Sequence, residues 1–307
     1  MTDLLDQLET EQRNLDTMHI DEMNTLDMIS MMNHEDKKVA FAVEKQLPMI
    51  AQAIDCIDEQ MRQGGRLLYI GAGTSGRLGV LDASECPPTF GVDNTLVHGI
   101  IAGGHAALTT AIEGAEDSVD DAKSALQAIA LNSNDVVCGL ASSGKTPFVI
   151  GGLEYAKEMG CQTISICCVS NAMISSIADF PIETMTGAEA LTGSTRLKAG
   201  TAQKMVLNML TTCAMIKRGK VYSNLMVDVQ PTNAKLKQRA IGIVMTSIDC
   251  TQEVAIKLLD ETNYSVKKAI LVGLTGLNQE ECQKILDDNH QHVSNAIKSV
   301  KNKVSSC

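Results

Sequence analysis

Glycine and hydroxyl residues are concentrated in two short segments of the chain. The first, residues 71–76, reads Gly-Ala-Gly-Thr-Ser-Gly, and the second, residues 139–146, reads Gly-Leu-Ala-Ser-Ser-Gly-Lys-Thr. Each follows a short apolar run and precedes a helical pattern. Because small residues let backbone amides approach an anion, and a helix N-terminus favours negative charge, both segments predict phosphate binding. Ordinary tight turns are the alternative interpretation.

Both segments also match nucleotide-binding patterns. The first fits Gly-x-Gly-x-x-Gly, but the next strand ends in Ile-Ala-Gly-Gly-His at 101–105, without the acidic residue that would bind a ribose. The second fits the P-loop pattern letter for letter, but the neighbouring strand ends in Cys-Cys-Val-Ser at 167–170, without an acid to organise magnesium. A single ligand with one phosphomonoester and several sugar hydroxyls could be bound by both segments, which is a simpler interpretation. Open α/β sheets bind ligands at the carboxyl ends of their strands, where both segments lie.

Two glutamates, Glu85 and Glu116, are candidates for proton transfer. Glu85 lies in the helix that begins at the first segment, and we expect Pro87 and Pro88 to stop that helix just beyond it. Glu116 follows Gly114, where we expect one helix to break and another to start. A position at the end of an element suits a carboxylate in an active site, and a solvated surface glutamate is the alternative for both.

The elements that must position these residues read as an α/β fold. Helical spacing covers residues 1–62, and from residue 66 onward short apolar runs alternate with helical patterns. Strands alternating with helices predict a doubly wound parallel sheet covered on both faces. The expected strands are residues 67–70, 96–102, 135–140 and 163–168, and the expected later helices are residues 198–217, 251–261, 265–273 and 278–288. We therefore expect an N-terminal helical segment (1–62), a sheet domain (63–240) and a small helical module (241–307).

The composition excludes several classes of function. The 307 residues include 26 basic and 37 acidic side chains, a net charge of −11, and no Trp, which argues against nucleic-acid binding. No apolar stretch approaches the ~18 residues of a membrane helix. The acidic N-terminus lacks the order of a signal peptide. The ten cysteines form no Cys-x-x-Cys pair, so we expect reduced thiols, no metal and a cytoplasmic protein.

The longest of these motifs resemble one known family. The strings Gly-Ala-Gly-Thr-Ser-Gly-Arg-Leu-Gly, Glu-Cys-Pro-Pro-Thr-Phe and Glu-Gly-Ala-Glu-Asp-Ser are similar to signatures of the N-acetylmuramic acid 6-phosphate etherases. Similar strings occur in residues 67–90, 100–104, 113–118, 187–204 and 224–229. The resemblance covers nearly the whole chain. It implies a sugar-isomerase-type (SIS) phosphosugar-binding domain, a C-terminal module similar to UBA-like folds, and a homodimer with a shared active site.

The resemblance also implies roles for individual residues. Glu85 matches the proton donor of the family and Glu116 its second acid/base residue. Arg196 and Lys198 could reach the phosphate or lactyl carboxylate of a neighbouring subunit's ligand, with a helix salt bridge as the alternative, and Glu189 is either a site residue or a cap. The positions implied for phosphosugar binding are Gly73, Thr74, Ser75, Gly76, Ser142, Ser143, Gly144, Thr146, Glu189, Ser194, Arg196 and Lys198.

The implied reaction cleaves the lactyl ether of N-acetylmuramic acid 6-phosphate to give N-acetylglucosamine 6-phosphate and D-lactate. Elimination followed by water addition requires two positioned carboxyl groups and no metal or redox cofactor. Three alternatives remain: a non-catalytic phosphosugar sensor similar to glucokinase regulatory proteins, a phosphosugar isomerase, and an ATP-binding P-loop enzyme.

Overall fold

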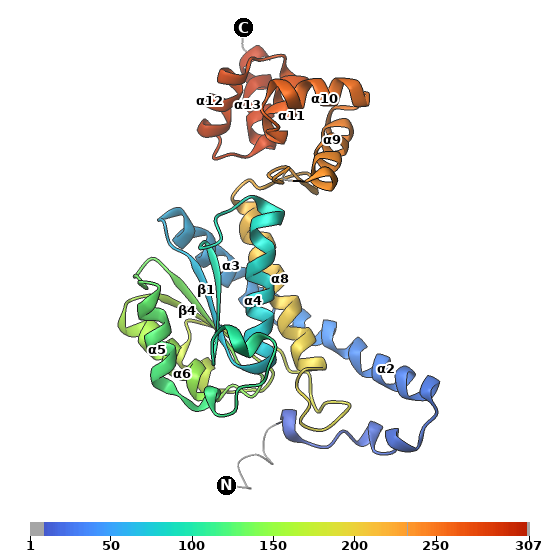
Figure 1. The fold of residues 1–307 in the computed structure, drawn as a ribbon, viewed down its shortest axis with the longest axis vertical. Helices are drawn as coiled ribbons and strands as arrows, with labels where there is room; N and C mark the ends of the chain where they lie inside the picture. The colour runs from blue at the N-terminus through green and yellow to red at the C-terminus, as the bar shows by residue number, and fades with distance from the viewer. Residues whose placement is uncertain (1–8, 232, 306–307) are drawn as a thin grey trace. The chain divides into compact units, whose positions relative to one another are not determined.

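The computed structural model describes residues 9–231 and 233–305, which form two compact units (Figure 1). The first unit contains the described residues up to Ser84 and the segment Asn94–Thr211, and the second contains Glu85–Asp93 and the chain from Thr212. The second unit thus begins earlier than the helical module expected from residue 241. No described helix is both long and apolar enough to cross a membrane.

A five-stranded parallel sheet forms the centre of the first unit, in the order β2-β1-β3-β4-β5. The strands are β1 (Leu67–Gly71), β2 (Val97–Ile101), β3 (Val136–Leu140), β4 (Gln162–Cys167) and β5 (Phe180–Glu183). The predicted doubly wound parallel sheet is confirmed, although β5 was not expected, since its sequence Phe-Pro-Ile-Glu is short and contains proline. Because β1 and β3 are neighbours, the two loops that follow them lie at the same edge of the sheet.

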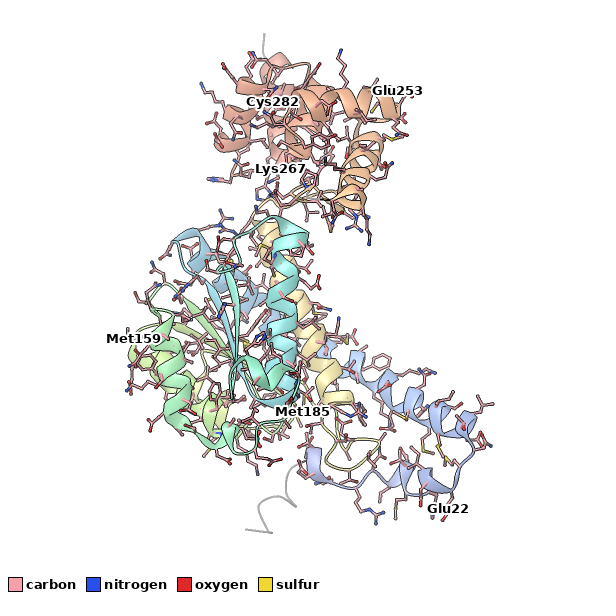
Figure 2. All side chains as sticks on the ribbon, in the orientation of Figure 1. Glu22, Met159, Met185, Glu253, Lys267 and Cys282 are labelled. Atoms are coloured by element: carbon pink, nitrogen blue, oxygen red, sulfur yellow. The ribbon has the colours of Figure 1, made fainter. Side chains whose placement is uncertain are left out.

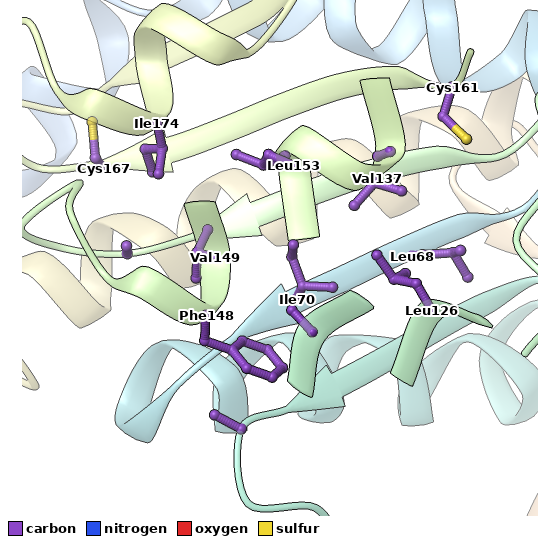
Figure 3. Close-up of a cluster of buried hydrophobic side chains, with 14 of the residues drawn as sticks. Leu68, Ile70, Leu126, Val137, Phe148, Val149, Leu153, Cys161, Cys167 and Ile174 are labelled. Atoms are coloured by element: carbon purple, nitrogen blue, oxygen red, sulfur yellow. The ribbon is translucent and has the colours of Figure 1, made fainter. Parts of the chain in front are cut away.

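Helices cover both faces of this sheet, because successive strand residues point to opposite sides. One face packs against α5 (Val119–Ala128), α6 (Pro147–Glu158) and α7 (Met173–Ile177). Figure 3 shows Leu68, Ile70 and Val137 of the strands meeting Leu126 and Leu153 of these helices. The opposite face carries α3 (Leu47–Arg62), α4 (Gly73–Phe90) and α8 (Lys198–Lys217).

Helices α4 and α8 run parallel to each other, with their N-termini together. Ser75 in the first turn of α4 donates a hydrogen bond to Gln203 in α8 (2.8 Å), and Thr211, two turns further along α8, donates one to Asp82 (3.2 Å). Both N-termini therefore lie near the carboxyl ends of the strands. Their partial positive charges add at the edge of the sheet where the sequence predicts an anion.

The expectation that Pro87 and Pro88 end the first helix is wrong, because α4 continues through both prolines to Phe90. A proline costs a helix the hydrogen bond that its nitrogen would donate, but the backbone can still follow the helix for a last turn. The helix ends at Gly91, whose φ of +61° is left-handed and whose N–H donates to the carbonyl of Pro87 (2.9 Å). Glu85 therefore lies within α4, not at its end.

The N-terminal segment is less helical than expected. Residues 9–24 contain only the short 3₁₀ turns η1 (Glu9–Glu11), η2 (Leu15–Thr17) and η3 (Ile20–Glu22), and residues 1–8 lie outside the described part of the chain. The predicted helices are present from α2 (Thr25–Glu44) onward. α2 keeps much of its apolar surface exposed, including Leu26, Ile29 and Phe41.

The second unit is mainly helical, as the sequence predicts for its later part. The expected caps Thr251, Ser265 and Asn278 each precede a helix, while α9 and α13 were not expected. Lys267, labelled in Figure 2, is buried within this unit and pairs with Asp228 (2.6 Å). The elements are β6 (Val221–Tyr222), β7 (Leu225–Met226), α9 (Ala234–Ile248), α10 (Gln252–Glu261), α11 (Val266–Thr275), α12 (Gln279–Asp288) and α13 (Val293–Ser305).

Candidate active site

A cavity of about 210 Å³ opens beside the loop that follows β1. Its lining combines Gly73 and Arg77 from the start of α4 with Ala102 after β2 and the two acidic residues Glu113 and Glu116. The cavity therefore joins the predicted phosphate loop to one of the two predicted catalytic glutamates. All of these residues belong to the first unit.

The loop after β1 is shaped by close backbone contacts. The carbonyl of Gly71 accepts a hydrogen bond from Ala102 (2.9 Å), and a Cβ at Gly76 would lie only 2.7 Å from the carbonyl oxygen of Gly71. Gly76 therefore allows α4 to start directly against the strand. Ser75 is buried and donates its hydroxyl to Gln203 Oε1, while Gln203 Nε2 is buried without a partner among the described residues. The free lone pairs of Ser75 and this amide donor suit a polar ligand.

The loop after β3 presents hydroxyls on a rigid backbone. Cys168 donates its N–H to the carbonyl of Ser142 (2.9 Å), and Gly144 takes a φ of +68°. The half-buried hydroxyls of Ser142, Ser143 and Thr146 make no hydrogen bond to the part of the chain that the structure describes. Thr146 is also the N-cap residue of α6, and the proline that follows it suits the first position of a helix. The hydroxyls are therefore available to a ligand near a helix N-terminus.

Glu116 lies in the short 3₁₀ turn η5 (Ala115–Asp117), directly after Gly114 (φ +73°). No α-helix precedes Gly114, contrary to expectation, because the chain from β2 forms only the 3₁₀ turn η4 (His105–Leu108) and a loop. Ser118 then caps α5, as expected, by accepting from the N–H of Asp121 (3.2 Å). Glu116 is exposed and lines the cavity from its short 3₁₀ turn.

Glu85 is also exposed, but it does not line this cavity. Twelve residues of α4 separate it from Gly73, which at 1.5 Å per residue is about 18 Å along the helix axis. Glu116 therefore lines the cavity of the first unit, whereas Glu85 belongs to the second unit.

Lys198 and Glu189 have the structural roles that were the alternatives to ligand binding: Lys198 forms a salt bridge at a helix start, and Glu189 caps that helix. Lys198 is buried in the first turn of α8, and its ammonium group pairs with the buried carboxylate of Glu35 in α2 (2.6 Å). Glu189 accepts hydrogen bonds from the N–H groups of Lys198 and Ala199 (both 2.9 Å), which caps α8. Burial raises the pKa of Glu189, and these two hydrogen bonds oppose the rise.

Ser194 and Arg196 lie in the loop that leads into α8. Ser194 is half-buried and Arg196 is exposed. A Cβ at Gly200, in the first turn of α8, would lie 3.5 Å from Thr74 Cγ2, which places this helix start next to the loop after β1. Arg77 and Glu113 were not among the predicted site residues. The available signal for Arg77 was its position one helical turn after Gly73, on the same face of α4.

Comparison with known proteins gives full-length matches. The chain is 55% identical over 98% of its length to an N-acetylmuramic acid 6-phosphate etherase of Clostridium botulinum, covering 100% of that protein. It is 53% identical over 96% of its length to an N-acetylmuramic acid 6-phosphate etherase of Clostridioides difficile, covering 97% of that protein. Residues 49–157 match the N-terminal SIS domain of glucokinase regulatory proteins, and residues 112–213 match the SIS domain.

A solved structure shares the fold of the sheet region. A Bacteroides fragilis protein named "putative phosphosugar isomerase involved in capsule formation" superimposes with a TM-score of 0.51 at 19% identity, covering 66% of this chain and 95% of that one.

Proposed function

Because the chain belongs to the N-acetylmuramic acid 6-phosphate etherase family, an enzyme family of carbon–oxygen lyases, we propose that it cleaves the D-lactyl ether of N-acetylmuramic acid 6-phosphate with water. The products are N-acetylglucosamine 6-phosphate and D-lactate, in cytoplasmic amino-sugar catabolism and cell-wall recycling. The observation that carries this proposal is the full-length identity of 55%. The cavity that joins a phosphate loop to Glu116 supports it independently.

The phosphate of the sugar binds at the carboxyl ends of β1 and β3. Backbone amides at Gly73–Gly76 and the hydroxyls of Ser142, Ser143 and Thr146 supply donors there, together with the N-terminal ends of α4 and α6. Ser75 and Thr74 lie in the first turn of α4, and Gly144 allows the left-handed backbone of the second loop. Binding the phosphate away from the reacting carbons positions C2 and C3 of the sugar without entering the chemistry.

The ether bond breaks by elimination, because a lactate alkoxide is too poor a leaving group for direct hydrolysis. The aldehyde at C1 of the ring-opened sugar acidifies the C2 proton, and a carboxylate removes that proton. The C3–O bond then breaks as a carboxylic acid protonates the departing oxygen, giving D-lactate and a conjugated aldehyde. Water adds at C3 and a proton returns to C2, which yields N-acetylglucosamine 6-phosphate.

Glu116 and Glu85 divide these proton transfers. Glu116 serves as the base at C2 or at the attacking water, since it faces the cavity next to the phosphate loop. Glu85 serves as the acid that protonates the lactate oxygen. Such a division needs two carboxyl groups in different environments. Both glutamates are exposed in the single chain. The different environments of their carboxyl groups therefore arise when the substrate and a second subunit cover them.

The enzyme acts as a homodimer with a shared site. About 18 Å of α4 separates Glu85 from the phosphate loop of its own chain, so the Glu85 that completes each site comes from the partner subunit. The exposed apolar side chains Leu26, Ile29 and Phe41 on α2 give a second copy a surface to cover. Lys198 and Glu189 hold the start of α8 in place, while Ser194 and Arg196 lie beside it for contact with the ligand.

The first experiment incubates the protein with N-acetylmuramic acid 6-phosphate in D2O, assays D-lactate and looks for deuterium at C2. We expect lactate together with C2 deuterium, and we expect E85Q and E116Q each to lower kcat by at least about a hundredfold. E113Q is the matched control, since Glu113 lines the same cavity but has no assigned proton transfer. Folded protein that binds phosphosugars and releases no lactate would instead indicate a sensor.

A further inference from the structure

The proposed substrate carries a second anion that the cavity must accommodate. The lactyl group ends in a carboxylate, which N-acetylglucosamine 6-phosphate lacks. The residues that line the cavity already include two acidic ones, Glu113 and Glu116. A lactyl carboxylate that enters next to them is repelled unless a cation pairs with it.

Arg77 is the only basic residue that lines the cavity among the described residues. It is half-buried, and its Nε donates to the carbonyl of Leu108 (3.1 Å). Neither terminal guanidinium nitrogen makes a hydrogen bond or ion pair with the described residues. The side chain is therefore tethered at Nε and keeps the fork of two nitrogens that pairs well with a carboxylate.

The other basic residues near the loops are less suited to this task. The ammonium group of Lys198 is buried and already pairs with Glu35 (2.6 Å). Lys145 and Arg196 do not line the cavity. Arg77 also lies four residues after Gly73, about 6 Å along α4, so it is close to the phosphate loop without being part of it.

We propose that Arg77 binds the lactyl carboxylate and sets the specificity of the cavity for the ether over phosphosugars that lack an acidic substituent. This inference rests on the proposed etherase function and extends it to one residue. The guanidinium group accepts no proton and takes no part in the bond breaking. Arg77 is thus a specificity-determining residue that touches the substrate at a distance from C2.

The test compares N-acetylmuramic acid 6-phosphate with its lactyl carboxamide, in which the negative charge is removed from the ligand. The wild type should cleave the acid with a kcat/KM on the order of ten- to a hundredfold higher than the amide, as a charge-assisted pair implies. R77Q should reduce this ratio to near one, and R77K should restore part of it. K123Q removes a positive charge on α5, outside the cavity, and should keep the wild-type ratio.

A purely structural role for Arg77 predicts a different outcome. If Arg77 only anchors the loop through Leu108, R77Q will weaken binding of the product N-acetylglucosamine 6-phosphate as much as binding of the substrate. The acid-to-amide ratio will then stay at the wild-type value. That result overturns the inference, as does a wild type that cleaves acid and amide equally well. If R196Q loses the acid-to-amide ratio of kcat/KM and R77Q keeps it, the lactyl carboxylate binds Arg196, and the inference about Arg77 is also overturned. A wild type that cleaves neither compound contradicts the etherase function itself.

Discussion

At the scale of single residues, the pair of Lys198 and Glu35 joins the N-terminal helix α2 to the start of α8. Both side chains are almost fully buried, and their charged atoms are 2.6 Å apart. Asn14 and Lys38 also donate hydrogen bonds to Glu35, so the carboxylate is well satisfied. Because Lys198 opens α8, whose first turn adjoins the loop after β1, this pair fixes the start of α8 beside that loop.

Removal of Glu35 should destabilise the protein. E35A leaves the ammonium of Lys198 buried without its partner, and we expect a loss of about 3–5 kcal/mol in the free energy of unfolding. Urea denaturation measures this loss. D36N, at the exposed neighbouring position, should change stability by less than about 0.5 kcal/mol. Equal effects of the two variants would contradict the role assigned to the buried pair.

The same pair predicts a pH dependence. Burial raises the pKa of Glu35, but hydrogen bonds from Lys198 and Lys38 outweigh it and lower the pKa from 4.5 to about 2. A lowered pKa stabilises the folded state above pH 4.5, and this contribution, roughly 3 kcal/mol, is lost as the pH falls towards 2. The difference in unfolding free energy between wild type and E35Q should therefore shrink from pH 5 to pH 3. A constant difference would show that the charge of Glu35 does not stabilise the fold.

At the scale of elements, the site depends on how tightly two loops turn from strand to helix. In the loop after β3, a Cβ at Gly144 would lie 2.3 Å from the Cβ of Ala172, and its φ of +68° is unfavourable for other residues. The loop conformation that presents Ser143 and Thr146 therefore requires glycine at this position.

G144A should displace this loop and weaken phosphosugar binding. We expect the Kd for N-acetylglucosamine 6-phosphate, measured by isothermal titration calorimetry, to rise by at least about tenfold, with a stability loss of about 1–3 kcal/mol from backbone strain. G242A is the matched control, because nothing lies within 4 Å of a Cβ there and Gly242 is in the interior of α9. It should raise stability by up to about 1 kcal/mol and leave the Kd unchanged. Unchanged binding in G144A would exclude the second loop from the phosphate site.

At the scale of the whole molecule, the separation of Glu85 from the cavity predicts subunit complementation. In a symmetric dimer with shared sites, each site takes Glu116 from one chain and Glu85 from the other. E85Q and E116Q should each be nearly inactive alone, given the expected loss in kcat of at least about a hundredfold. After mixing, unfolding and refolding, half of the dimers should be mixed, and one of the two sites in each should have both glutamates. The activity should then recover to about a quarter of the wild type.

Sedimentation in the ultracentrifuge must show a dimer for this result to be interpreted. The control mixes E85Q with the double variant E85Q/E116Q, which cannot form a complete site in either arrangement. Recovery in the first mixture and not in the second supports the shared site. No recovery from a verified mixed dimer would mean that each chain supplies both of its own glutamates.

Local sequence patterns are enough to predict most of the elements and the two loops at the edge of the sheet. Apolar periodicity, glycines at left-handed positions and capping residues such as Asn278 act over a few neighbouring residues, so the strands β1 to β4, the bounds of α8 and the caps of α10 to α12 could be predicted. The family motifs indicated Glu85 and Glu116 as candidates. The prediction that α4 ends before Pro87 was wrong. Local helix propensity counts the hydrogen bonds that proline removes, but it does not include the tertiary packing that stabilises the last turn.

Contacts between residues that are distant in the chain depend on how the elements pack in three dimensions. Lys198 and Glu35 are 163 positions apart in the chain, and their pairing depends on how α2 lies against α8. Arg77 became a candidate because Glu113 and Glu116 line the same cavity, although a loop and an entire strand separate them from α4 in the sequence. Such contacts arise when elements pack on a sheet. The free energy that favours them is distributed over the whole core, so a local sequence pattern cannot predict them.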